Sequence, residues 1–280
     1  MIVHLVDGTY ELFRQFYGRR RFNQGVDQPY GAVLGVLHSI LEQIEGGATH
    51  LGVATDHVIE SFRNELWPGY KTGAGIEPAL WRQFPQLEAA LAAMGVVVWP
   101  MIELEADDAL ASAARIASED PRVEKVCIWA NDKDLAQCVR GDRVVQVDRR
   151  AGEIRDAEAV RKKFGVPPEL IADYLALVGD AQDGYPGIRG IGAVGAARLL
   201  NRHGPIEAFP PDVLGQQRES ALLFKRLATL VTDAPLFDSV AALEWRGPTG
   251  EFPAWVKQMG DERLLARCLK ARADGGPKVA

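Results

Sequence analysis

Acidic side chains follow four candidate β-strands of this chain, at the points where the strands end. Asp7 directly follows the apolar run Ile2–Val6, and three later runs are each followed by one or more acids. The carboxyl ends of parallel strands meet at one edge of a sheet, where α/β proteins bind their ligands. The acids at these ends, with a further pair three residues apart, are Asp7, Asp56, Glu105, Asp107, Asp108, Asp132, Asp134, Asp180 and Asp183.

So many carboxylates can share a small site only if cations neutralise them, because like charges a few ångströms apart repel strongly at reduced dielectric constant. Hard divalent cations suit such oxygen ligands, so we expect Mg²⁺ or Mn²⁺. A pair of these ions in a nuclease or phosphatase clamps the attacking and leaving oxygens of a phosphoryl displacement. Taken singly, each Asp is better explained as a helix cap or a turn residue. The coincidence at four strand ends favours the metal site.

A glycine-dense stretch at 187–195 is the second candidate site. Gly190, Gly192 and Gly195 match a G-x-G-x-x-G string, but a dinucleotide-binding loop would directly follow a strand, and here a helix precedes the glycines. We expect a helix–hairpin–helix whose second helix presents its N-terminus to a DNA phosphate, with Arg198 adding a backbone contact. The alternative is a glycine-rich turn between helices that has only a packing role.

The pattern of apolar residues predicts a scaffold for these sites. Short β-branched runs alternate with helical periods, which is typical of a doubly wound, mainly parallel sheet. The predicted strands are Ile2–Val6, His50–Ala54, Val96–Trp99, Val126–Ala130 and Val144–Val147, with a hairpin to Glu153–Arg155. The predicted helices are Val33–Ile44, Asp107–Ala117, one from Pro167 to Leu177, Val194–Asn201, Ala221–Val231 and Asp261–Ala271.

Strand signals nearly vanish after residue 160. We expect an α/β domain at 1–160 and a mostly helical region at 161–280, with the helix–hairpin–helix at about 174–202. Residues 57–85, which are rich in Gly and Pro, interrupt the α/β pattern. Their composition alone favours a substrate-covering segment and a plain surface loop equally.

Composition is that of an ordinary globular protein. The chain has 280 residues, 47% of them hydrophobic and 25% charged, without an apolar run long enough to span a membrane. It lacks a signal-peptide pattern, and its three widely spaced cysteines suggest neither disulfides nor zinc, so we expect a cytoplasmic protein. The net charge of -6 alone argues against a nucleic-acid partner. If nine of the 38 acids bind metal ions, however, the 32 basic residues outnumber the rest and the objection fails.

Six motifs stand in order along the chain. They are Val6-Asp7-Gly8, Phe62-Arg63 through Tyr70-Lys71, Glu105-Ala106-Asp107-Asp108, Asp132-Lys133-Asp134-Leu135, Gly179-Asp180 through Asp183, and Pro186-Gly187 through Leu200. Together they resemble the 5′-nuclease (flap endonuclease) superfamily, and most of all the 5′→3′ exonuclease domain of bacterial DNA polymerase I and its stand-alone relatives. The resemblance covers Ile2 to about Leu236. It implies a PIN-like sheet, a helical arch at 57–85 and a hairpin that grips duplex DNA.

The resemblance also implies roles for single residues. Those matching acids around a first metal ion are Asp7, Asp56, Glu105 and Asp107. Those matching acids in or near a second metal site are Asp108, Asp132, Asp134, Asp180 and Asp183. Lys71 and Arg63 match basic arch residues that contact the scissile phosphate or the threaded 5′ strand. A K⁺ ion in the hairpin is a further implication.

Two departures from the family pattern bear on activity. Gln182-Asp183-Gly184 stands where relatives usually have Ser-Asp-Asn, but both acids are kept, so the metal ions are still expected. Residues 72–76 lack the arginine that relatives usually carry there, which weakens the expected grip of the arch. The basic run Arg19-Arg20-Arg21 either compensates by binding DNA or is simply solvated.

The expected activity is therefore hydrolysis of DNA by a 5′→3′ exonuclease and flap endonuclease with two Mg²⁺ (or Mn²⁺) ions, in replication or repair. The expected substrate is DNA with a 5′ flap, a 5′ overhang or a nick. We expect a monomer without membrane contact, and a separate DNA polymerase as a candidate partner. One alternative, favoured by the weak arch, is an inactive relative that binds DNA junctions. A PIN-type ribonuclease is the other alternative, and the hairpin argues against it.

Overall fold

A computed structural model, which describes residues 1–22 and 28–275, has a six-stranded sheet of order β3-β2-β1-β4-β5-β6. Neighbouring strands are parallel except at the edge, where β6 runs antiparallel to β5. The strands are β1 (Ile2–Asp7), β2 (His50–Asp56), β3 (Val97–Met101), β4 (Lys125–Trp129), β5 (Val144–Asp148) and β6 (Glu153–Arg155). The predicted doubly wound, mainly parallel sheet is confirmed.

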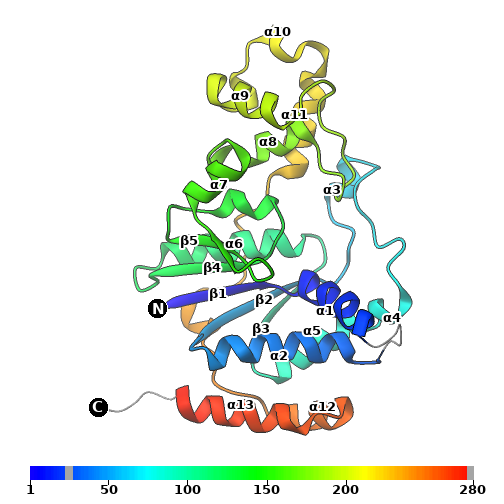
Figure 1. Cartoon of the computed structure of the whole chain (residues 1–280), viewed down its shortest axis with the longest axis vertical. Coiled ribbons are helices and arrows are strands. Elements are labelled where there is room, and N and C mark those ends of the chain that lie inside the picture. The colour runs from blue at the N-terminus through cyan, green and yellow to red at the C-terminus, as the bar shows by residue number, and fades with distance from the viewer. Residues whose placement is uncertain (23–27, 276–280) are drawn as a thin grey trace.

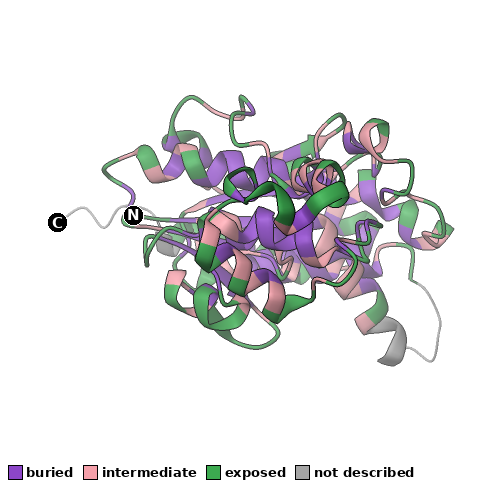
Figure 2. Ribbon diagram, turned by 90° about the horizontal axis from the view of Figure 1, so that it is seen from above, coloured by how far each residue is buried: buried purple, intermediate pink, exposed green. Residues whose placement is uncertain are grey.

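Helices cover both faces of this sheet, because its strands alternate their apolar side chains between the faces. Val6 and Val53 pack with the helices of one face, and Leu5 and Ala54 pack with the helix of the other. The first face carries α1 (Gly8–Phe22), α2 (Gly31–Glu45) and α5 (Gln83–Ala93), and the second carries α6 (Ala106–Glu119). Figure 1 shows this layering, and in Figure 2 the buried residues concentrate within it.

A second core holds together the helices after the sheet, at the top of Figure 1. They are α7 (Ala157–Phe164), α8 (Ile171–Val178), α9 (Ala193–His203), α10 (Pro211–Leu214) and α11 (Arg218–Ala228), with 3₁₀ turns η2 (Pro168–Leu170), η3 (Ile206–Ala208) and η4 (Gly215–Gln217). The helix predicted from Pro167 is thus a 3₁₀ turn followed by α8. The helix predicted to reach Val231 ends at Ala228, and the Val231 N–H instead donates to Asp108 Oδ1 at 2.8 Å.

The end of the chain returns to the α/β body. After the 3₁₀ turn η5 (Val240–Leu243) come α12 (Phe252–Met259) and α13 (Glu262–Gly275). They bury Phe252 and Leu264 in the core shared with α2 and α5, and Figure 1 shows them at the bottom, away from α9 and α11. The helices of the predicted 161–280 region therefore lie in two separate places. Within the described residues no helix has the length and apolar character needed to cross a membrane.

Residues 57–85 contain α3 (Arg63–Leu66), α4 (Pro78–Trp81) and the start of α5. The part around α3 packs under the helical region: the Trp67 ring meets Phe224 edge to face with centroids 5.4 Å apart, and Tyr70 is buried. Trp67 Nε1 also donates to the Gly184 carbonyl at 3.0 Å. A plain surface loop therefore does not describe this part of the segment, which reaches the edge where the acids lie.

Candidate active site

The strand order brings the predicted acids to one edge of the sheet. β1 lies between β2 and β4, so Asp7 at the end of β1 is flanked by Asp56 and by the loop after β4 that carries Asp132 and Asp134. The helix α6 begins at the same edge, with Glu105 as its N-cap and two further acids in its first turn. Parallel strands and the start of one helix thus supply one wall of the site.

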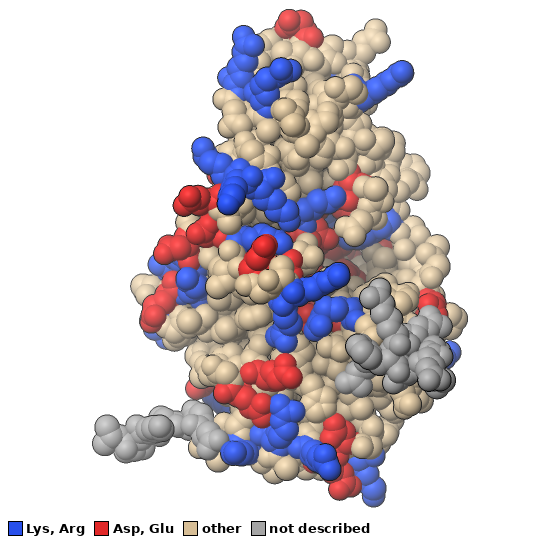
Figure 3. Space-filling model, viewed as in Figure 1, with Lys and Arg blue, Asp and Glu red and all other residues tan. Residues whose placement is uncertain are grey.

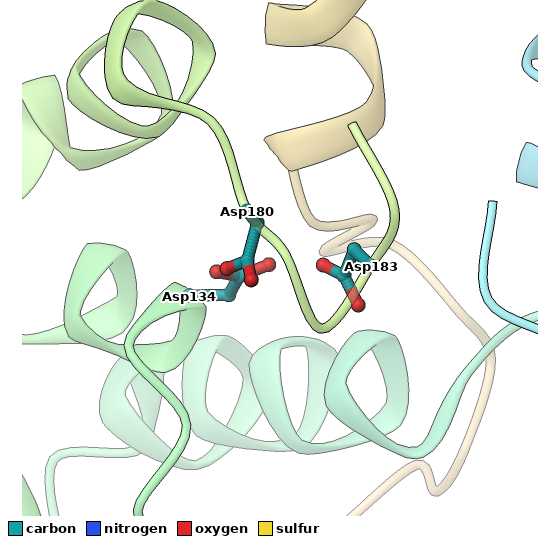
Figure 4. Close-up of side chains that lie close together, drawn as sticks. All are labelled: Asp134, Asp180 and Asp183. Atoms are coloured by element: carbon teal, nitrogen blue, oxygen red, sulfur yellow. The ribbon is translucent and has the colours of Figure 1, made fainter. Parts of the chain in front are cut away.

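The helical region supplies the opposite wall. α8 ends at Val178, and the next residue is Gly179, whose φ of +83° and close approach to Pro186 leave no room for a side chain. Two backbone hydrogen bonds between Asp180 and Tyr185, of 2.9 and 3.0 Å, then close a tight loop that carries Asp183. This loop aims both of its acids at Asp134, as Figure 4 shows.

Asp134, Asp180 and Asp183 form a compact buried group, each with one carboxylate oxygen within 4.8 Å of the others'. Asp134 Oδ1 is buried without a hydrogen-bond partner. Burial, reinforced by Asp132 and the other acids of the group, raises the pKa of Asp134 well above its usual value, and burial raises the pKa of Asp183 to about 6. Buried acceptors without donors are the ligands that a hard cation requires, so the residues present fit a divalent metal ion.

A second set of acids, with raised pKa values, lies around Asp7. Burial raises the pKa of Asp7 to about 8, and the negative charges of Asp56 and Asp132 contribute to this rise. A hydrogen bond from the Tyr10 N–H to Asp7 Oδ1, of 2.8 Å, acts in the opposite direction. Burial together with Asp132 and Asp7 likewise raises the pKa of Asp107, whose Oδ1 is buried and unpartnered. In the described part of the chain, however, Asp134, Asp180 and Asp183 are the one trio with oxygens as close as 4.8 Å.

Two lysines neutralise part of this negative charge. Lys71 Nζ lies 2.6 Å from Glu105 Oε2 and 3.3 Å from Asp183 Oδ1, and its side chain is 27% exposed. Although burial opposes it, ion pairing with Lys71 and Arg63 lowers the pKa of Glu105. Lys133 Nζ lies 2.6 Å from Asp180 Oδ2. Lys133 was not predicted as a site residue, although it stands between two candidate ligands, Asp132 and Asp134.

Arg63 and Asp108 are placed differently from the prediction. The Arg63 side chain is 1% exposed, and it donates to both oxygens of Asp108 at 2.7 Å and to the carbonyls of Leu227 and Thr229. Asp108 also accepts from the backbone N–H groups of Glu105 and Val231, so its oxygens are fully engaged. The burial of Arg63 contradicts the expectation that it contacts DNA, and Asp108, which was expected in or near a second metal site, has no oxygen left for direct contact with a metal ion. The pair instead joins α3, which contains Arg63, to α6 and to the end of α11.

The predicted hairpin lies at the surface between α8 and α9. Gly190 has a φ of +88°, and a methyl group on Gly190 or Gly192 would meet only open space. Val194, in the first turn of α9, is 85% exposed, and Arg198 is exposed as well. By contrast, Gly187 has a φ of +71° and abuts the backbone of Gly179, which makes it a packing residue.

Comparison with known proteins bears on this architecture. Residues 2–165 match the family described as 5′-3′ exonuclease, N-terminal resolvase-like domain, and residues 166–251 match 5′-3′ exonuclease, C-terminal SAM fold. The 5′-3′ exonuclease of Aquifex aeolicus (strain VF5) is 31% identical over 258 residues, covering 88% of this chain and 87% of that relative. DNA polymerase I of Bacillus subtilis (strain 168) is 31% identical over 280 residues, covering 94% of this chain but only 32% of the polymerase. The chain spans about a third of that relative's length.

A solved structure has the same fold. The bacteriophage T5 flap endonuclease, in a pseudo-enzyme–product complex with DNA and metal ions, superposes with a TM-score of 0.66 at 18% identity, over 95% of this chain and 100% of that one. The fold is thus a PIN-like, resolvase-type sheet followed by a SAM-like helical domain. The similarity expected from the sequence motifs is confirmed by these matches, and the chain belongs to the 5′-3′ exonuclease family.

Proposed function

We propose that this chain hydrolyses DNA phosphodiesters as a divalent-metal-dependent 5′ nuclease that acts at 5′ flaps, 5′ overhangs and nicks. The observation that carries the proposal is the buried group of Asp134, Asp180 and Asp183, which contains an unpartnered oxygen and lies against a lysine of the arch segment. An acid cluster of this kind serves phosphoryl transfer when its charge is offset by metal ions.

In this proposal two sets of acids hold two Mg²⁺ or Mn²⁺ ions. The first set is Asp7, Asp56, Glu105 and Asp107, and the second is Asp132, Asp134, Asp180 and Asp183. Divalent ions there would lower the pKa of a bound water and stabilise the leaving oxygen. Asp108 is left out because its hydrogen bonds are already complete.

Lys71 is the residue that we assign to the reacting phosphate. Its ammonium group is held by Glu105 and Asp183 at the mouth of the site and remains 27% exposed. Metal ions held by those two carboxylates would supply the positive charge that Lys71 gives them here, and the ammonium group would then be free to approach a non-bridging phosphate oxygen. Its long flexible stem allows this movement while the backbone stays fixed by the Lys71 N–H, which donates to the Asp183 carbonyl at 3.1 Å.

DNA binding is assigned to the surface around the hairpin. Gly190 and Gly192 are exposed just before α9, Gly195 is half-buried in its first turn, and Arg198 is exposed, so this surface suits phosphates of a duplex. Figure 3 shows further Lys and Arg side chains gathered where the helical region meets the sheet. The side chains of Arg19, Arg20 and Arg21 lie outside the described residues, although their backbone belongs to α1, and their contact with DNA stays a prediction.

The proposal extends to K⁺ at the hairpin, a monomeric state, a role in replication or repair, and a separate polymerase as partner. A cytoplasmic location also belongs to it, supported by three cysteines that are all buried free thiols.

Cleavage of a 5′-flap duplex labelled at either end, with Mg²⁺ or with EDTA, tests the proposed function. Asp132→Asn should abolish cleavage, whereas Asp142→Asn, at an exposed position outside the acid cluster, should cut like the wild type. Binding of the flap without cleavage, in Mg²⁺ and in Mn²⁺, would instead support the inactive relative that the uncharged segment 72–76 favours. Preferential cleavage of single-stranded RNA would support the ribonuclease alternative.

A further inference from the structure

Asp180 is the most thoroughly engaged acid of the buried trio. Its Oδ1 accepts a hydrogen bond from the Gln182 N–H at 2.9 Å, which fixes the carboxylate within the loop after α8. Its Oδ2 lies 2.6 Å from Lys133 Nζ, and the Asp180 side chain is 2% exposed. One of the two carboxylate oxygens of Asp180 is therefore paired with a cation that belongs to the protein itself.

Lys133 approaches the trio from the loop after β4, whereas Lys71 belongs to the segment after α3. It is the N-cap residue of the 3₁₀ helix η1 (Asp134–Cys138) and directly precedes Asp134 of the trio. Its side chain is 33% exposed, so the flexible stem has solvent into which its ammonium group can withdraw. The two lysines together give the closely spaced carboxylates the positive charge that they need when the site holds no metal ion.

A divalent ion and this ammonium group cannot both lie on Asp180 without strong repulsion, because each carries positive charge at a few ångströms in a partly buried site. We propose that Lys133 is the counter-cation of the metal-free site, and that its displacement from Asp180 sets how tightly the trio binds a divalent ion. This inference rests on the proposed metal site at Asp134, Asp180 and Asp183, and it assigns to Lys133 a role that is separate from contact with DNA.

The consequence for metal binding has a definite sign. A neutral side chain at 133 no longer competes for Asp180, so the metal affinity should rise. The same change leaves the metal-free trio less well neutralised, so the metal-free protein should become less stable. An ion pair with only a structural role would lower stability equally with and without metal and would leave the metal affinity unchanged.

Lys133→Met removes the charge and keeps the length of the side chain. Lys225→Met is the matched control, because Lys225 Nζ lies 2.8 Å from Asp173, an equally buried acid outside the site, and Lys225 is 21% exposed. Mn²⁺ binding to EDTA-dialysed protein without DNA is measured by isothermal titration calorimetry, and the melting temperature is measured in EDTA and in saturating Mn²⁺.

We expect Lys133→Met to bind Mn²⁺ roughly fivefold more tightly at one site, while Lys225→Met binds like the wild type. The melting temperature of Lys133→Met should fall more in EDTA than in Mn²⁺. Unchanged or weaker Mn²⁺ binding by Lys133→Met, or equal tightening in both variants, would overturn the inference. If the methionine variant does not fold, Lys133→Gln is measured in its place with the same expectation.

The wild-type titration separates this inference from the proposed function. Wild-type protein that binds no Mn²⁺ would contradict the metal site itself, and the inference about Lys133 would fall with it. Wild-type protein that binds Mn²⁺ with the same affinity as Lys133→Met would contradict only the role of Lys133.

Discussion

Two acids that are neighbours in the first turn of α6 have opposite surroundings. Asp108 accepts four hydrogen bonds, two from the terminal guanidinium nitrogens of Arg63 and two from backbone N–H groups. Asp107, by contrast, has a buried oxygen without any hydrogen-bond donor. Both lie in the same four-residue motif, Glu105-Ala106-Asp107-Asp108, and both match the family pattern. The difference shows that the donors supplied by the rest of the fold, and not the acid itself, decide whether a carboxylate holds the structure or serves the site.

The largest expected effect comes from changing Asp107, the acid with an oxygen that has no hydrogen-bond donor. Asp107→Asn should lower the rate of flap cleavage by roughly 10³-fold or more, because metal ions contribute several kcal/mol to such reactions. The melting temperature in EDTA should stay the same or rise, because the change removes one charge from a crowded group. Cleavage assays and thermal melts check both halves. Wild-type cleavage by Asp107→Asn would remove this residue from the metal site.

Changing Arg63, the charged partner of the fully hydrogen-bonded Asp108, should lower stability and not the rate of cleavage. Arg63→Met leaves Asp108 buried without its charged partner and should lower the free energy of unfolding by about 3 kcal/mol or more, measured by urea denaturation. The loss should be equal in EDTA and in Mn²⁺. Lys71→Met is the comparison: the Lys71 side chain is itself 27% exposed, so its loss should cost less stability. A stable Arg63→Met that fails to bind flaps would restore the DNA-contact role.

The dependence of stability on pH sharpens the same comparison. The pKa of Asp7 is raised to about 8 by burial, so the folded protein binds a proton that the unfolded chain releases above about pH 4. Stability in EDTA should therefore fall as pH rises from about 4 to 8, by at most about 1.4 kcal/mol per unit for this group, and Asp7→Asn should remove that fall. Thermal melts across this range measure it.

Asp148 gives the opposite sign and is the control. Although burial opposes the effect, hydrogen bonds from Ala151 N–H and Arg155 lower the pKa of Asp148. Its stabilising contribution is present above the unfolded pKa of about 4 and is lost as pH falls through the lowered folded value. Asp148→Asn should therefore cost stability at neutral pH and cost little in acid. Parallel curves for Asp7→Asn and Asp148→Asn would contradict the contrast between the two acids.

Much of this arrangement was predictable from local pattern. The strands were found because β-branched runs end at acids, and parallel strand ends must share an edge. The helix α1, in which Leu12 and Phe16 are buried, was not predicted from the sequence. α5 was missed because Pro85 in its first turn made the segment look like a loop. Both helices are stabilised by tertiary packing more than by their own sequence.

The site residues divide in the same way. Spacing alone placed Asp7 and Asp134 at one edge, but it could not show that Arg63 turns inward, because its acceptors Leu227 and Thr229 are distant in sequence. The pairing of Lys133 with Asp180 is hidden for the same reason. Contacts between the sheet and the helical region decide these roles, and no local motif carries that information.

The smallest expected effects concern two glycines of the hairpin, the enclosed Gly187 and the exposed Gly192, which give the same contrast between a structural role and a role in the site. Gly187→Ala places a methyl group 2.3 Å from the Gly179 nitrogen, and the φ of +71° alone costs about 1–2 kcal/mol, so the free energy of unfolding should fall by about 2 kcal/mol or more. Gly192→Ala meets open space and should leave stability unchanged, yet weaken duplex binding a few-fold if the hairpin contacts phosphates. Urea denaturation and fluorescence anisotropy measure the two quantities. Unchanged duplex affinity in Gly192→Ala would contradict phosphate binding by the hairpin. The exposed Gly192 would then have no role in DNA binding, and the hairpin would serve only packing, as the enclosed Gly187 does.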